Sequence, residues 1–75
     1  MNIFDELIAI MDELGIAIEE TGEFVDVDSI TFIALIIRIE ETFGIVFPDD
    51  LLVSSAIKNA HNLETIISNI MSNEN

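Results

Sequence analysis

The chain has 75 residues, 51% of them hydrophobic, and carries 15 Asp and Glu against 2 Lys and Arg, for a formal net charge of −13. A mean hydropathy of +0.55 excludes a disordered chain, and the length leaves room for one small domain, which we expect to span residues 1–75. The charge repels phosphates, which excludes nucleic acid and anionic membranes as partners and favours basic protein surfaces.

The N-terminal part of the chain predicts a helix and then a loop. Apolar residues recur at helical spacing over residues 3–14, with acidic residues between them, and Gly15 follows where a helix would end. Residues 16–28 contain the turn dipeptide Thr21-Gly22 and no sustained helical period. We expect a long ordered loop there, and loops of this length in small domains tend to be functional.

The rest of the chain predicts three more helices. Ser29 is a suitable N-cap for a second helix over residues 29–43, which Gly44 terminates. The Asp pair after Pro48 indicates a short third helix over 49–53. Asn62 is a candidate cap for a last helix over 62–71, and the polar tail 72–75 should fray. The predicted fold is therefore all-α, a bundle of three longer helices and one short helix.

The second helix has two apolar stripes. On a helical wheel the first spans about 100°, wide enough for a core-facing surface, and consists of Phe32, Leu35, Ile36, Ile39 and Phe43. The second stripe, centred some 130° away, consists of Ile30, Ile33 and Ile37, flanked by Ala34, Glu40 and Glu41. A small bundle can hardly bury both stripes, so we expect the second to form a docking face beside Ser29. Burial under the short third helix is the alternative.

The residue inventory offers little for catalysis. Nucleophilic chemistry at Ser29 would need a general base, and the only His, His61, falls in a predicted linker. Adjacent carboxylates diverge by about 100° around a helix and cannot converge on one bond. An EF-hand beginning at Asp26 fails because Ile30 occupies the fifth ligand position. We therefore expect no catalytic residue and no metal site.

Compartment and membrane association are constrained by what the sequence lacks. No Cys is present, which excludes disulfides and thiolate metal sites and suits the cytoplasm. No signal-peptide pattern precedes the first helix, so we expect a cytoplasmic protein. The longest nearly apolar run, Ile30 to Ile39, is about half of the roughly 20 residues that a membrane-spanning helix needs.

The remaining candidate is the Ser29 hydroxyl at the mouth of a helix, where free N–H groups and the helix dipole favour a phosphodiester. Asp28-Ser29-Ile30 resembles the Asp-Ser-Leu or Asp-Ser-Ile signature of acyl and peptidyl carrier proteins. The segment LIIRIEETFGIVFPDD, residues 35–50, follows at the family's distance. The resemblance covers almost the whole chain and implies an acyl-carrier-like four-helix bundle.

By this resemblance, Ser29 would receive 4′-phosphopantetheine from coenzyme A, and the arm would hold acyl or aminoacyl groups as thioesters. Partners would be a phosphopantetheinyl transferase and the ligases or synthases of fatty-acid, polyketide or nonribosomal peptide biosynthesis, which often present basic patches. The protein itself would be a carrier and no enzyme. Asp28 would form the cofactor site together with Ser29 and would also contact partners. The other residues placed at partner contacts are Ile30, Ile33, Ala34, Ile37, Glu40 and Glu41. We expect a monomer, and the start at Met1 directly before the first helix favours a free-standing protein.

An acidic helical interaction module with the carrier fold and no prosthetic group is the competing hypothesis. In it, Ser29 would act only as a helix cap. The presence of Asp28 before Ser29 favours the carrier, since a serine cap requires no preceding acid.

Overall fold

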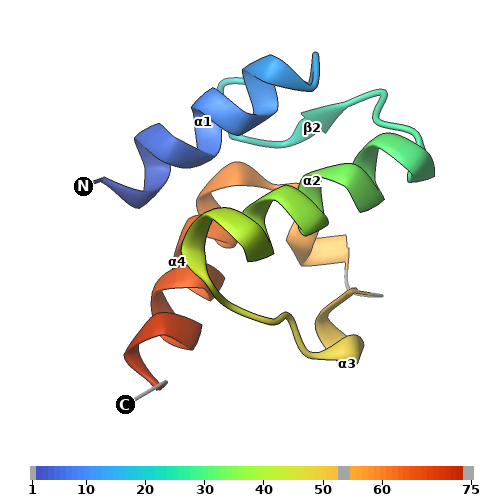
Figure 1. Ribbon diagram of the computed structural model, residues 1–75. Coiled ribbons are helices and arrows are strands. Elements are labelled where there is room, and N and C mark those ends of the chain that lie inside the picture. Colours follow the sequence, from blue (N-terminus) through green and yellow to red (C-terminus); the bar gives the residue numbers. More distant parts are fainter. Residues whose placement is uncertain (1, 53–54, 74–75) are drawn as a thin grey trace.

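Figure 1 shows the computed structural model, which describes residues 2–52 and 55–73. The elements, in chain order, are α1 (Ile3–Glu13), β1 (Ala17–Ile18), β2 (Phe24–Val25), α2 (Ser29–Phe43), α3 (Asp49–Leu52), the 3-10 helix η1 (Ser55–Lys58) and α4 (Ala60–Ser72). The predicted helical bundle of three longer helices and one short helix is confirmed. Across the described part of the chain, no helix is long and apolar enough to cross a membrane.

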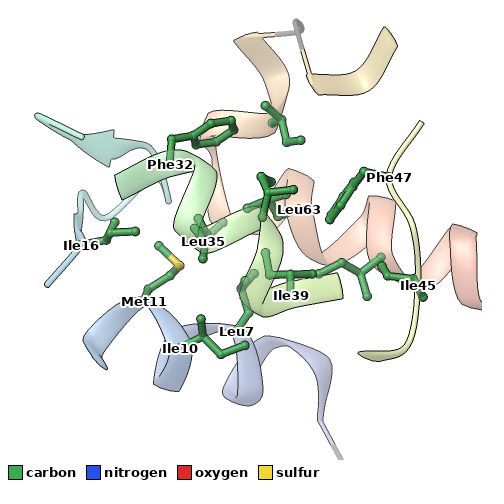
Figure 2. Packing of buried hydrophobic residues seen from close by; sticks show 14 residues of the cluster. Leu7, Ile10, Met11, Ile16, Phe32, Leu35, Ile39, Ile45, Phe47 and Leu63 are labelled. Atoms are coloured by element: carbon green, nitrogen blue, oxygen red, sulfur yellow. The ribbon is translucent and has the colours of Figure 1, made fainter. Parts of the chain in front are cut away.

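One apolar core joins α1, α2 and α4. Figure 2 shows Leu35 and Ile39 of α2 directed toward Leu7 of α1 and Leu63 of α4. These four side chains are fully buried. Phe47, from the segment after α2, and Ile57 of η1 are also buried in this core. Because α2 contributes to the core along most of its length, its rotation about its own axis is fixed by packing.

Two predicted helix ends shift by one residue. α1 ends at Glu13 with Leu14 as its C-cap, one residue before the predicted end. The predicted third helix is observed as Asp49–Leu52, and residue 53 lies outside the described part of the chain. At the C-terminus, α4 continues to Ser72, one residue beyond the predicted end, so the predicted tail begins one residue too early.

The prediction that the last helix begins at Asn62 is wrong. Asn59 is the N-cap of α4, because its side-chain oxygen accepts the N–H groups of His61 at 2.9 Å and Asn62 at 3.2 Å. Two asparagines three positions apart offered the same cap chemistry, and the sequence alone did not separate them. His61 therefore lies in the first turn of α4 and not in a linker.

The predicted loop contains a small antiparallel hairpin, which the sequence analysis missed. β1 pairs with β2 through Ala17 opposite Val25 and Ile18 opposite Phe24. Strands of two residues are too short to produce an alternating pattern in the sequence. The turn of this hairpin is fastened to α4, because the Ala60 N–H donates to the Gly22 carbonyl at 2.8 Å.

His61, in the first turn of α4, contacts both α1 and the turn of the hairpin. Its ring stacks on Phe4, with the ring centroids 5.0 Å apart and the planes 8° from parallel. Gly22 is buried against the same ring with a φ of +92°, and a Cβ at Gly22 would lie 2.6 Å from His61 Cδ2 and 3.0 Å from Asn59 Oδ1. Only glycine fits this turn, both for its backbone conformation and for its space.

Gly22→Ala should destabilise the fold more than Gly44→Ala, although both residues have positive φ. At Gly44 a Cβ would meet nothing within 4 Å, so the cost should be the backbone strain of about 1–2 kcal/mol. At Gly22 the clash with His61 and Asn59 should add about 1–3 kcal/mol. Urea denaturation of the two variants measures the difference. Equal losses of stability at the two positions would show that the His61 ring can move away from a Cβ at position 22 without cost. The close packing of His61 on Gly22 would then contribute nothing to stability.

Candidate functional site

The first turn of α2 is organised by Asp28. Its backbone is extended, with φ −77° and ψ 166°, and its Oδ1 accepts the Thr31 N–H at 2.7 Å. Asp28 is therefore the N-cap, and the prediction of Ser29 in that role is wrong. Aspartate and serine are about equally good N-caps. Because α2 begins at Ser29, the residue directly before it, Asp28, is the N-cap. Ser29 becomes the first helical residue.

This arrangement leaves the Ser29 side chain unused by the fold. Ser29 is exposed, and its hydroxyl makes no hydrogen bond with any residue in the ranges 2–52 and 55–73. The first N–H groups of a helix have no partner within the helix, and the helix dipole is positive at that end. A primary hydroxyl therefore stands, accessible from solvent, at a place where negative charge is favoured.

The hydrogen bond from the Thr31 N–H lowers the pKa of the Asp28 carboxyl below its usual value. A carboxyl whose pKa lies below the usual value of about 4 is ionised at neutral pH. Its capping role also bears on the two competing hypotheses. Asp28 has a structural reason to precede Ser29, so its presence no longer separates a carrier from an interaction module that lacks a prosthetic group.

The two stripes of α2 lie as the sequence predicted. Phe32, Leu35, Ile36 and Ile39 are buried, and Phe43 is half-buried. The second stripe is exposed, at 80% for Ile30, 57% for Ile33 and 50% for Ile37. Burial of this stripe under α3, the alternative in the sequence analysis, is therefore wrong. Its role in docking stays a prediction.

The residues that flank the exposed stripe differ in their surroundings. Ala34 is half-buried and Glu41 is exposed. Glu40 is partly buried, and its Oε2 accepts the Phe47 N–H at 2.9 Å. Glu40 therefore fastens the segment between α2 and α3, a structural contact that the sequence did not reveal.

An apolar groove of about 290 Å³ runs beside the exposed stripe, between α2 and α3. Its lining residues are Phe32, Ile33, Ile36, Ile37, Glu40 and Leu52. It begins at Phe32, one helical turn after Ser29. The groove could not be predicted from the sequence, because it depends on the distance between α2 and α3, which no local pattern encodes.

The position of Lys58 is a further feature that the sequence did not reveal. Lys58 lies at the end of η1, and its Nζ is 5.8 Å from the centroid of the Phe32 ring. Only its rarity could have drawn attention to it, since the chain has two basic residues. Elsewhere in the described ranges, no group of three or more His, Cys, Asp or Glu side chains could hold a metal ion.

A model of the protein family described as a phosphopantetheine attachment site matches residues 7–66 of the chain. The match contains all of α2, the capping residue Asp28 and Lys58. Searches of the curated proteins and of the solved structures found no match. The geometry at the start of α2 fits an attached phosphodiester. It combines the positive end of a helix with an exposed hydroxyl that makes no hydrogen bond to any described residue.

The cap predicts how stability depends on pH. Because the pKa of Asp28 is lower in the folded state, its ionised form stabilises the fold above its unfolded pKa of about 4, and this contribution is lost as the pH falls through the folded pKa. The melting temperature of Asp28→Ala should therefore lie below that of the wild type at pH 7, and the gap should shrink toward pH 3.

Asp12→Ala is the matched control, since Asp12 is an exposed carboxylate on α1 that caps no helix. Its gap to the wild type should be the smaller one at pH 7. A gap for Asp28→Ala that stays constant between pH 7 and pH 3 would contradict the cap.

Proposed function

We propose that Ser29 is the residue to which 4′-phosphopantetheine is attached. The chain belongs to the phosphopantetheine attachment site family, which is the starting point of this proposal. Domains of this family are generally non-catalytic carriers that interact with phosphopantetheinyl transferases and biosynthetic enzymes. The attached group supplies a terminal thiol that holds an acyl or aminoacyl group as a thioester. The chain's own residues bind partners and present that group.

The observation that carries the proposal is that Asp28, and not Ser29, caps α2. The carboxylate caps the helix through Thr31, which leaves the neighbouring hydroxyl exposed and without a structural task. By contrast, the Thr65 hydroxyl donates to the His61 carbonyl within α4. Ser29 therefore combines access to solvent with the positive electrostatic environment of a helix N-terminus.

The exposed stripe of α2 supports a docking role beside Ser29. Ile30 follows Ser29 directly, and Ile33 lies one helical turn further along the same side. A transferase or synthase that covers Ile30, Ile33, Ala34 and Ile37 would therefore reach the Ser29 hydroxyl. Glu40 and Glu41, with the net charge of −13, favour partners with basic docking surfaces.

Under this proposal the partners are a phosphopantetheinyl transferase and acyl- or aminoacyl-loading ligases or synthases. The pathway would be fatty-acid, polyketide or nonribosomal peptide biosynthesis, with the protein acting as a cytoplasmic monomer. The alternative, an interaction module of the same fold without a prosthetic group, would use the same exposed stripe. Only covalent modification separates the two.

Incubation with coenzyme A and a broad-specificity phosphopantetheinyl transferase should add a single phosphopantetheine to each chain. Intact mass spectrometry measures the addition. Because the chain contains no Cys, a thiol-reactive dye offers a second readout, and labelling should appear only after modification. Ser29→Ala should abolish both signals, and Ser68→Ala, which removes an exposed hydroxyl on α4, should leave both intact.

A native protein that gains neither mass nor thiol would leave the interaction module as the better account. An equal gain on Ser29→Ala would show that a different residue is the attachment site.

Ile33→Asp and Ile37→Asp should change the free energy of unfolding by less than about 0.5 kcal/mol, because both side chains are half exposed. The same changes should slow modification by the transferase, since each removes an apolar contact and places a charge in the contact surface. Thermal melts followed by circular dichroism, together with transferase kinetics, measure the two effects.

Leu35→Ala and Ile39→Ala are the controls, because both side chains are 0% exposed. Each should cost about 2–5 kcal/mol through lost burial and a cavity. If the Asp variants unfold as severely as these controls, or are modified as fast as the wild type, the stripe is not the docking face.

A further inference from the structure

Lys58 lies next to the start of α2, although 29 positions separate it from Ser29 in the sequence. Its Nζ is 5.8 Å from the centroid of the Phe32 ring. Phe32 lies three positions after Ser29, and side chains at this spacing are neighbours on a helix surface, with about 5–6 Å between their Cβ atoms. The lysine ammonium is therefore close to the turn of α2 that carries the proposed attachment site.

Lys58 is one of only two Lys and Arg residues in an acidic chain. Of the two basic residues, Arg38 pairs with Glu13, with 2.5 Å between Nη2 and Oε2. Lys58 takes part in no ion pair within residues 2–52 and 55–73. Lys58 is an exposed residue, and its ammonium lies over the ring of Phe32. In a chain of net charge −13, an unpaired cation beside the first turn of α2 is available to an anion attached there.

Attachment of a phosphodiester to Ser29 would add a negative charge directly after the ionised Asp28. The positive end of the helix offsets part of that repulsion. Lys58 is the remaining source of compensation, because Arg38 lies more than two turns further along α2 and is occupied by Glu13. The lysine has a flexible stem and three donors, which suits a phosphate oxygen whose position changes.

We propose that Lys58 is a positioning residue for the prosthetic group. Its ammonium pairs with the phosphodiester on Ser29 and holds the base of the arm against Phe32. Phe32 also lines one end of the apolar groove between α2 and α3, so the pair directs the arm toward the groove instead of into solvent. This inference rests on Ser29 being the attachment site.

The ion pair between Lys58 and the phosphodiester should be weak, and a carrier needs a weak pair because it must release its arm to partner enzymes. Ion pairs at exposed positions are weak and weaken further in salt. The pair therefore biases the resting position of the arm and releases it when a partner enzyme competes for the phosphate. A buried pair of the same groups would hold the arm in place and would hinder its delivery.

The test compares unmodified and modified forms of the wild type and three variants, Lys58→Gln, Lys58→Arg and Arg38→Gln. For each protein, the change in melting temperature on modification is measured at low ionic strength. Modification should lower the melting temperature of Lys58→Gln by about 2 °C more than that of the wild type. Lys58→Arg should restore the wild-type change, and Arg38→Gln, which removes the same charge at a distance, should match the wild type.

A second readout follows the position of the arm without any partner enzyme. In the modified wild type, nuclear Overhauser effects should connect the Phe32 ring protons with methyl protons of the pantetheine arm. Lys58→Gln should weaken them severalfold, and 1 M NaCl should do the same to the wild type, because the Debye length there is about 3 Å.

Identical melting-temperature changes in all four proteins, with unchanged Overhauser effects, would overturn the role of Lys58. In that case mass gain at Ser29 would still stand, and the proposed function would be unaffected. A wild type that gains no mass would overturn the proposed function and this inference together.

Discussion

The inward stripe of α2 is the constraint on which the rest of the site depends. Burial of Phe32, Leu35, Ile36 and Ile39 against α1 and α4 fixes the rotation of the helix. With that stripe inside, Ile30, Ile33 and Ile37 can only face solvent. Each buried side chain of this size contributes about 1.5–3 kcal/mol, so no single surface contact could rotate the helix against them. The exposure of this second stripe is thus a consequence of the core.

The position of Ser29 along the helix is set by a second, local interaction. The Asp28 carboxylate captures the Thr31 N–H and makes Asp28 the residue at which the helix begins. The segment that leads to Asp28 is restrained in turn, because the hairpin before it is fastened to α4 by Gly22, Asn59 and His61. The candidate attachment residue is therefore presented from a defined backbone, with an exposed side chain.

The fold was predictable from local sequence patterns to a large extent. The helical spacing of apolar residues and the Gly residues at their ends gave the bundle, and the two-stripe pattern of α2 gave the exposed surface. The features that escaped prediction depend on contacts between distant segments. The β1–β2 hairpin is too short for a periodic signal, and the contact between Lys58 and Phe32 joins residues 26 positions apart.

The choice between neighbouring caps also escaped prediction, at both Asp28 and Asn59. In each case two side chains of similar capping strength stood close together, and backbone geometry decided between them. At α2, the shift of the cap from Ser29 to Asp28 is only one residue, but it changes the role of both side chains. It transferred the structural task from Ser29 to Asp28 and left the serine hydroxyl available for modification.

The most direct test of this account is to locate the prosthetic group on the chain. After modification by the transferase, the protein is digested, and the peptides are fragmented in a mass spectrometer under conditions that keep phosphodiesters attached. The added mass should lie on Ser29, in the peptide that contains Asp28 and Ile30. Added mass on another hydroxyl, such as that of Thr21 or Thr65, would contradict it.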